Sequence, residues 1–224
     1  MLVLASASPR RRELLTQAGF TFQVHPAHIP EDLHPNEDPI AYVTRLAREK
    51  AHAVFDEITK TAASEQPGAP SFRLFSSERV GSNELHGAQA PSAALQVLGA
   101  DTTVTLDSHI LGKPEDPADA ARMLRLLSGR THRVVTGVAL VTANQTEVAA
   151  EVTAVRFLTL SEQEIEDYIA TGEPMDKAGA YAIQGRAARW IPRIEGCYFN
   201  VVGLPISLVS TLLASRRSAE SPDL

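Results

Sequence analysis

The first nineteen residues place the strongest constraint on how this chain can fold. Residues 2–5 form the apolar run Leu-Val-Leu-Ala, which is typical of a short buried strand. Ser8 then suits the N-cap of a helix, Pro9 suits the first helical position, and apolar residues recur at helical spacing as far as Gly19. The sequence therefore predicts a strand, a tight turn and a helix.

Three arginines, Arg10, Arg11 and Arg12, occupy the first turn of this predicted helix. Positive charge there costs about 0.3–1 kcal/mol per residue, because the start of a helix already carries partial positive charge. Free backbone N–H groups, serine hydroxyls and guanidinium groups together suit an anion, and phosphate fits them best. The alternative is a solvated basic helix start whose arginines form salt bridges.

Composition narrows the classes of function. A chain of 224 residues can bury one sizeable core, and its 44% apolar content is ordinary for a soluble protein. The net charge of −6 argues against a nucleic-acid polymer as partner, although Arg10–Arg12 keep RNA binding as an alternative. A single cysteine excludes an internal disulfide and favours the cytoplasm. We expect neither a signal peptide nor a membrane span, because the apolar runs are too short.

The remaining patterns mix helices with adjacent strands rather than alternating strictly. They predict an α/β fold, a single domain over residues 1–217, built on a mixed, partly antiparallel sheet flanked by helices. Helices are expected at 40–58, from Asp116 to Gly129, from Ser161 to Gly172, and from Pro205 onwards. Strands are expected at 20–24, 96–106, 110–111, 134–142 and 148–158, with a closing hairpin from 190–194 and 198–202.

Two segments have compositions that do not favour a packed core. Residues 60–95 are rich in Ser, Ala, Gly, Pro and Gln, which predicts a flexible insertion at a tip of the domain. Residues 218–224 are expected to form a disordered tail.

Asp101 is the strongest candidate for catalysis. It follows an apolar strand, and a carboxylate buried there needs a cation or hydrogen-bond donors. It could bind a divalent metal or orient and deprotonate a water molecule for attack on phosphorus. The alternative is a turn or capping aspartate.

Two further residues suggest contacts with a nucleotide. Lys113 stands between Gly112 and Pro114, which allow a ligand to approach closely, and its point charge suits phosphate. Gln184 lies in a glycine-flanked loop and offers both a donor and an acceptor, which a base edge requires and phosphate does not. Each could instead be an ordinary solvated side chain.

These residues lie in segments that together resemble the Maf family of nucleoside triphosphate pyrophosphatases. The resemblance covers the whole chain except the insertion and the tail. Its motifs are Ser6-Ala7-Ser8-Pro9-Arg10-Arg11, Arg45-Leu46-Ala47 with Lys50-Ala51, Gly99-Ala100-Asp101-Thr102, Gly112-Lys113-Pro114, the run Leu127-Ser128-Gly129 with His132, residues 176–185, and residues 201–205.

The resemblance implies a fold with a central cleft, like that of inosine triphosphate pyrophosphatase. It also implies hydrolysis of nucleoside triphosphates to the monophosphate and pyrophosphate, with Mg²⁺, Mn²⁺ or Co²⁺, by a homodimer. Asp101 would be the catalytic carboxylate and, with Glu31, a metal ligand. The residues that would bind the substrate are Ser6, Arg10, Arg11, Lys50, Lys113 and Gln184.

Arg10, Thr102 and Gln184 fall at positions that the resemblance associates with substrate choice. The sequence is similar to the branch of the family that prefers dTTP and UTP, through its motifs Pro-Arg-Arg, Ala-Asp-Thr and Ile-Gln-Gly. Modified pyrimidine nucleotides are further candidate substrates. The 7-methyl-GTP branch carries Ser-Asp-Gln in place of Ala-Asp-Thr. Ala182 departs from the family pattern, which has glycine there. A nucleotide-binding regulator of septation and cell division without turnover is the alternative function.

Overall fold

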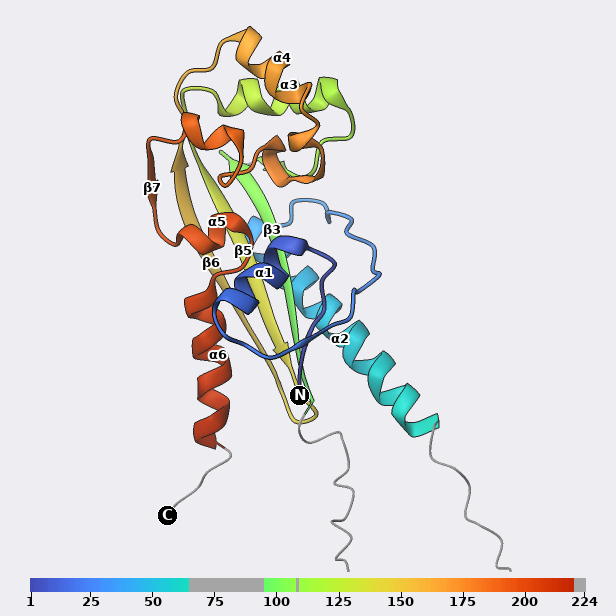
Figure 1. Cartoon of the computed structure of the whole chain (residues 1–224). Coiled ribbons are helices and arrows are strands. Elements are labelled where there is room, and N and C mark those ends of the chain that lie inside the picture. The colour runs from blue at the N-terminus through green and yellow to red at the C-terminus, as the bar shows by residue number, and fades with distance from the viewer. Residues whose placement is uncertain (65–94, 108, 220–224) are drawn as a thin grey trace, which may run out of the picture.

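Three long antiparallel strands form the centre of the protein (Figure 1). They are β3 (Gln96–Leu106), β5 (Thr131–Val141) and β6 (Thr146–Arg156). The computed structural model describes residues 1–64, 95–107 and 109–219. Within these residues the sheet has seven strands, and the four short ones are β1 (Leu2–Leu4), β2 (Gln23–Val24), β4 (His109–Leu111) and β7 (Arg193–Glu195).

The order of the strands confirms the predicted mixed sheet. It is β2-β1-β3-β5-β6-β7, and β4 pairs with the far end of β3. β1 runs parallel to β2 and β3, whereas every other pair is antiparallel. β1 and β4 pair with opposite ends of β3, so no strand of the described residues lies beside the edge of β3 over residues 99–103.

Helices cover both faces of the sheet. Helix α2 (Pro39–Ser64) packs on one face, and α1 (Pro9–Gln17) and α6 (Ile206–Ala219) pack on the other. Further structure lies beyond one end of the long strands (Figure 1). This upper lobe contains α3 (Pro117–Leu127), α4 (Glu162–Ile169) and the 3-10 turns η1 (Glu173–Asp176), η2 (Ala178–Ala180) and η3 (Arg186–Trp190).

Two glycines let α2 lie directly on the sheet. A Cβ atom at Gly99 would come within 2.1 Å of the carbonyl oxygen of Ala47, and one at Gly137 within 2.4 Å of that of Val43. Gly137 pairs with Asp101 across the two strands. This close packing brings the middle of α2 against the centre of β3, which is where Asp101 lies.

Several predicted helix ends are confirmed by their caps. Ser8 accepts a hydrogen bond from the N–H of Arg11 and begins α1, and Asp116 accepts one from the N–H of Asp119 and begins α3. Ser161 and Glu164 form the predicted capping box of α4.

The predicted hairpin at the end of the chain is wrong. Of the two strands predicted for this hairpin, only β7 forms, and it pairs with β6, whereas Tyr198–Val202 form the short helix α5. The buried Asn200 explains the difference, because its side-chain N–H group donates to the carbonyl of Val134 and to the hydroxyl of Thr153. These two contacts with the sheet fix a helical turn that the local sequence does not favour.

Other boundaries also differ from the prediction. The strand expected at 20–24 is reduced to Gln23–Val24, and the helix expected at 40–58 runs from Pro39 to Ser64. Residues 60–64 of the predicted insertion therefore belong to α2, and residues 65–94 lie outside the described residues. The loop expected at 176–185 contains 3-10 turns. Residues 218 and 219 of the predicted tail belong to α6, and the rest of the tail is not described.

A search of the described part of the chain finds no helix with the length and apolar character that crossing a bilayer requires.

Candidate active site

The gap along the edge of β3 opens into a cavity of about 590 Å³. Its wall includes the start of α1, the loop before α2, the centre of β3, the turn after β4, and the segments around residues 176–184 and 201–203. Five cationic and three acidic side chains line it, so the cavity is suited to an anion. They are Arg10, Arg11, Lys50, Lys113 and Lys177, with Glu31, Asp101 and Asp176.

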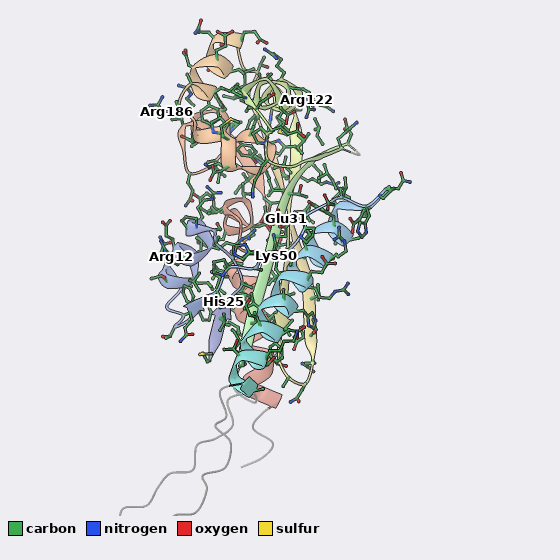
Figure 2. The ribbon with its side chains drawn as sticks, turned by 90° about the vertical axis from the view of Figure 1, so that its right-hand side faces the viewer. Arg12, His25, Glu31, Lys50, Arg122 and Arg186 are labelled. Carbon is green, nitrogen blue, oxygen red and sulfur yellow. The ribbon has the colours of Figure 1, made fainter. Side chains whose placement is uncertain are left out.

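The structure brings together every site residue that the sequence predicts. These residues, which lie far apart along the chain, all line the same cavity: Ser6, Arg10, Arg11, Glu31, Lys50, Asp101, Thr102, Lys113 and Gln184. Their roles in binding and catalysis stay predictions. Arg12 differs from its two neighbours, because it is exposed on the outer side of α1 (Figure 2).

Lys50 joins the two candidate acidic residues. Its ammonium nitrogen lies 2.7 Å from Oδ1 of Asp101 and 2.6 Å from Oε1 of Glu31. Lys50 and Asp101 are buried, each with 8% of its surface exposed, and Glu31 lies at the open side of this group. Figure 2 shows Glu31 and Lys50 close together beside α2. Lys50 is therefore not a solvated lysine on the surface of the helix.

Burial and charge act in opposite directions on these two carboxyl groups. For Asp101 burial dominates and raises the pKa, although Lys50 and Arg11 oppose the rise. Burial acts in the same sense on Glu31, but the hydrogen bond and charge of Lys50, with Lys113 and Arg11, lower its pKa overall. Asp101 is thus a stronger base than an exposed aspartate, as a general base requires.

Arg11 holds the two sides of the gap together. Its Nε donates to the carbonyl of Gly203 at 2.9 Å, and its Nη1 donates to the carbonyl of Ala100 at 2.9 Å and to Ser6 Oγ at 3.1 Å. Nη2 donates to Thr102 Oγ1 at 3.0 Å. Because these contacts use four of the five N–H groups of a guanidinium, Arg11 mainly supports the wall, and little of it remains for a phosphate.

Arg10 and Lys113 face the cavity with fewer protein contacts than Arg11 has. Arg10 lies 3.8 Å from Asp176, across the mouth of the cavity, and a contact of that length between exposed groups is weak. Lys113 is exposed, and its charge acts on Glu31. Arg10 is the second residue of α1, after Pro9, so its backbone N–H at the start of this helix borders the same space.

The loop before α2 is fixed by residues that the sequence analysis did not single out as site residues. Tyr42 donates its hydroxyl to the carbonyl of Glu31 at 2.9 Å. Arg45 binds both carboxylate oxygens of Glu37, at 2.7 and 2.8 Å, and the carbonyl of Asp32. The sequence offers one signal for these two residues, because Tyr42 and Arg45 are three positions apart and therefore lie on one side of α2. Their partners lie in an irregular loop, which has no periodic pattern that would predict the contacts.

Asp101 and Glu31 suit a small divalent cation, but they do not complete a site for one. Among residues 1–64, 95–107 and 109–219, no group of three or more His, Cys, Asp or Glu side chains could hold a metal ion. Mg²⁺ is commonly held by one or two carboxylates, water and the phosphates of the substrate. Two carboxylates that meet at one lysine nitrogen beside a cationic cavity fit that pattern.

The mixed sheet and the cavity define an α/β protein with a cleft for a phosphorylated ligand. A family comparison matches residues 1–216 to the family described as Maf-like protein. The chain belongs to this family.

Relatives with established names are similar over nearly the full length. The dTTP/UTP pyrophosphatase of Koribacter versatilis (strain Ellin345) is 49% identical over 95% of this chain and 92% of its own length. Those of Geobacillus sp. (strain WCH70) and Salmonella typhimurium are 46% and 45% identical, over 92% and 95% of this chain and 92% and 91% of their own.

Proposed function

We propose that this protein is a nucleoside triphosphate pyrophosphatase that hydrolyses dTTP and UTP to the nucleoside monophosphate and pyrophosphate. The observation that carries the proposal is the contact of Lys50 with both Asp101 and Glu31, inside a cavity that five cationic side chains line. The names of the relatives support dTTP and UTP as substrates, since they are similar over more than nine tenths of the chain.

The chemistry is a displacement at the α-phosphorus. Asp101 orients a water molecule and takes its proton, a new oxygen–phosphorus bond forms, and the bond between the α-phosphorus and the bridging oxygen breaks, which releases pyrophosphate. Ser6, Lys113 and Arg10, with the backbone N–H of Arg10 at the start of α1, hold the phosphates. Lys50 keeps Asp101 and Glu31 in place and adds positive charge near the reacting phosphate.

We also propose that a divalent metal, Mg²⁺, Mn²⁺ or Co²⁺, is held by Asp101 and Glu31 together with the substrate phosphates. When bound, such an ion supplies neutralisation of the charge that develops on the phosphate oxygens.

In this proposal Arg10, Thr102 and Gln184 select the pyrimidine base. Gln184 is exposed at the cavity and offers both a donor and an acceptor to a base edge. The hydroxyl of Thr102 accepts from Arg11 and contacts Thr136 at 2.9 Å, so it acts by fixing the wall beside the substrate. We also propose that the enzyme acts in the cytoplasm, where free nucleotides are found. We propose that it forms a homodimer, and light scattering can test this oligomeric state.

Release of pyrophosphate from a panel of triphosphates tests the proposal. The purified chain is supplied with dTTP, UTP, dCTP, CTP, GTP and 7-methyl-GTP, each with Mg²⁺, Mn²⁺ or Co²⁺. We expect turnover of dTTP and UTP, and we expect Asp101→Asn to lower kcat by about 10²–10⁴-fold, as loss of a general base does. Asp107→Asn, which changes an exposed aspartate at the end of the same strand, should keep normal turnover.

Other outcomes would identify the alternatives. Tight nucleotide binding without any release of pyrophosphate would favour a nucleotide-binding regulator. Preferred turnover of 7-methyl-GTP would overturn the pyrimidine assignment. Normal turnover by a correctly folded Asp101→Asn variant would remove Asp101 from the mechanism.

A further inference from the structure

The loop that carries Gln184 is held at both ends by two side chains that lie outside the cavity wall. Tyr168 belongs to α4 and Glu173 begins η1. We propose that Tyr168 and Glu173 are positioning residues that fix Gln184 against the base of the substrate and so determine which base is accepted. This inference rests on the proposed function, because it needs Gln184 to meet the base.

Three hydrogen bonds connect the pair to the loop, and a fourth joins its two members. The N–H of Ala182 donates to Tyr168 Oη at 3.2 Å, and the N–H of Arg186 donates to both carboxylate oxygens of Glu173, at 3.1 and 3.3 Å. Tyr168 in turn donates its hydroxyl to Oε1 of Glu173 at 2.8 Å. Residues 182 and 186 lie two positions before and after Gln184, so a single connected pair holds both sides of it.

Neither member of the pair can move easily. Tyr168 is 1% exposed, and its ring meets that of Trp190 edge to face at a centroid distance of 5.1 Å. Burial, and then the hydrogen bond to Glu173, raise the pKa of Tyr168, so its hydroxyl stays a donor over the whole physiological range. Lys177 donates to the backbone carbonyl of Glu173 at 2.7 Å and ties η1 to the segment that borders the cavity.

Gly185 shows how closely the loop fits Glu173. A Cβ atom at position 185 would lie 1.8 Å from Oε1 and 2.4 Å from Cδ of Glu173. The carboxylate therefore occupies the space that any other residue at 185 would need. A side chain at position 185 would therefore displace the carboxylate of Glu173 from the loop.

This arrangement affects base selection more than binding of the phosphates. A carboxamide discriminates between bases only if its donor and acceptor face the matching groups, and a misplacement of about 1 Å can cost about 10²-fold. Four of the five cationic groups, Arg10, Arg11, Lys50 and Lys113, belong to α1, α2 and the turn after β4, outside residues 182–186. The fifth, Lys177, binds the backbone carbonyl of Glu173, which variants of the Glu173 side chain keep. Loosening the loop should therefore reduce discrimination while catalysis continues.

The ratio of kcat/KM for UTP to that for CTP tests the inference, because the two substrates share their sugar and phosphates and differ at the base edge. We expect Tyr168→Phe and Glu173→Ala to lower this ratio by about tenfold, mainly through a higher KM for UTP. Gly185→Ala should have the same effect by displacing Glu173. Glu173→Gln keeps an acceptor for the N–H of Arg186 and should restore most of the ratio.

Two controls separate positioning from general damage. Glu162→Gln removes an exposed carboxylate of the same lobe that binds Arg125, and should leave the ratio unchanged. Amide hydrogen exchange measures the loop directly. In Tyr168→Phe and Glu173→Ala we expect faster exchange at Ala182 and Arg186, with unchanged exchange in β3 and β5.

Gln184→Ala makes the outcomes distinguishable. If it lowers the ratio and the Tyr168 and Glu173 variants do not, the inference is overturned while the proposed function stands. The inference is also overturned if Glu173→Ala lowers the UTP to CTP ratio but Gln184→Ala does not, because the pair is inferred to act through Gln184. Wild-type protein that releases pyrophosphate from neither UTP nor CTP would overturn the proposed function and, with it, this inference.

Discussion

At the scale of single residues, Lys50 is the point at which the charges of the cavity meet. A buried lysine and a buried aspartate are each unfavourable alone, and their contact at 2.7 Å offsets much of that cost. Glu31 adds a second negative group at 2.6 Å from the same nitrogen. The pKa values of the two carboxyl groups shift in opposite directions, because burial outweighs the nearby cations at Asp101, whereas Lys50, Lys113 and Arg11 outweigh burial at Glu31. One fixed cation therefore supports a stronger and a weaker base side by side.

The pair of Glu37 and Arg45 leads to a prediction on the effect of pH. The hydrogen bonds from Arg45 lower the pKa of Glu37 from 4.5 to about 2. A carboxyl group whose pKa is lower in the folded state stabilises the protein above the unfolded pKa, and this stability is lost as the pH falls through the folded value. We expect Glu37→Gln to lower the free energy of unfolding by about 1 kcal/mol at pH 7, and by progressively less between pH 4.5 and pH 2.

Urea unfolding of both proteins at pH 7, 4 and 3 measures this difference. A gap between wild type and variant that stays constant over this range would show that the carboxylate charge is not the source of the stability.

At the scale of elements, the site depends on how closely α2 lies on the sheet. Gly99 and Gly137 leave room for the backbone of α2, and this brings Lys50 to Asp101. Both strands need glycine there for space, since neither position has a positive φ. Arg11 acts on the other face, where it binds the carbonyl of Ala100 at the edge that no neighbouring strand covers.

Replacement of Gly137 by alanine should therefore damage both stability and activity. The new Cβ would lie 2.4 Å from the carbonyl oxygen of Val43, so α2 must move away from β5 and carry Lys50 with it. We expect a loss of about 1–3 kcal/mol in the free energy of unfolding, as overpacking usually costs, and a fall in kcat. Chemical denaturation and the pyrophosphate assay measure these two effects.

Gly112→Ala serves as the comparison for stability, because nothing lies within 4 Å of the position that its Cβ would occupy. Equal stability of the two alanine variants would contradict the close packing of α2.

At the scale of the whole molecule, the cavity joins segments from almost the entire chain. Residues from Ala5 to Gly203 contribute to its wall, including the start of α1, the centre of β3 and the segments that lead into the upper lobe. A ligand that contacts all of these parts at once favours the folded state over the unfolded one. Occupancy of the cavity should therefore raise the stability of the whole molecule.

A non-hydrolysable dTTP analogue with an α,β-methylene bridge tests this expectation by thermal unfolding. At a concentration of 100 times its Kd it should add ~2.7 kcal/mol to the free energy of unfolding. Lys113→Ala should reduce the effect at a fixed concentration, because it removes one charge from the phosphate end. Thymidine, which lacks phosphates, serves as the control. If it raises the unfolding temperature as much as the analogue does, the cavity does not recognise its ligand through the phosphates.

The local sequence was enough to determine the mixed sheet and the caps at Ser8, Asp116 and Ser161, since these follow from periodicity and capping. Its motifs and the family resemblance also named six of the eight charged residues that line the cavity, but not Asp176 and Lys177. It failed at Tyr198–Val202, where contacts of Asn200 with two strands stabilise a helix. It could not show that donors of Arg11 bind the wall of the cavity, and the role of Arg11 in binding the substrate stays a prediction.

Only the tertiary structure decided which charges meet. Lys50 and Asp101 are 51 positions apart, and Arg45 faces a loop with no regular pattern. The distance between two such groups depends on how closely α2 approaches the sheet, and on which edge of β3 is left open. Those are properties of packing between distant segments, which no local pattern of residues encodes.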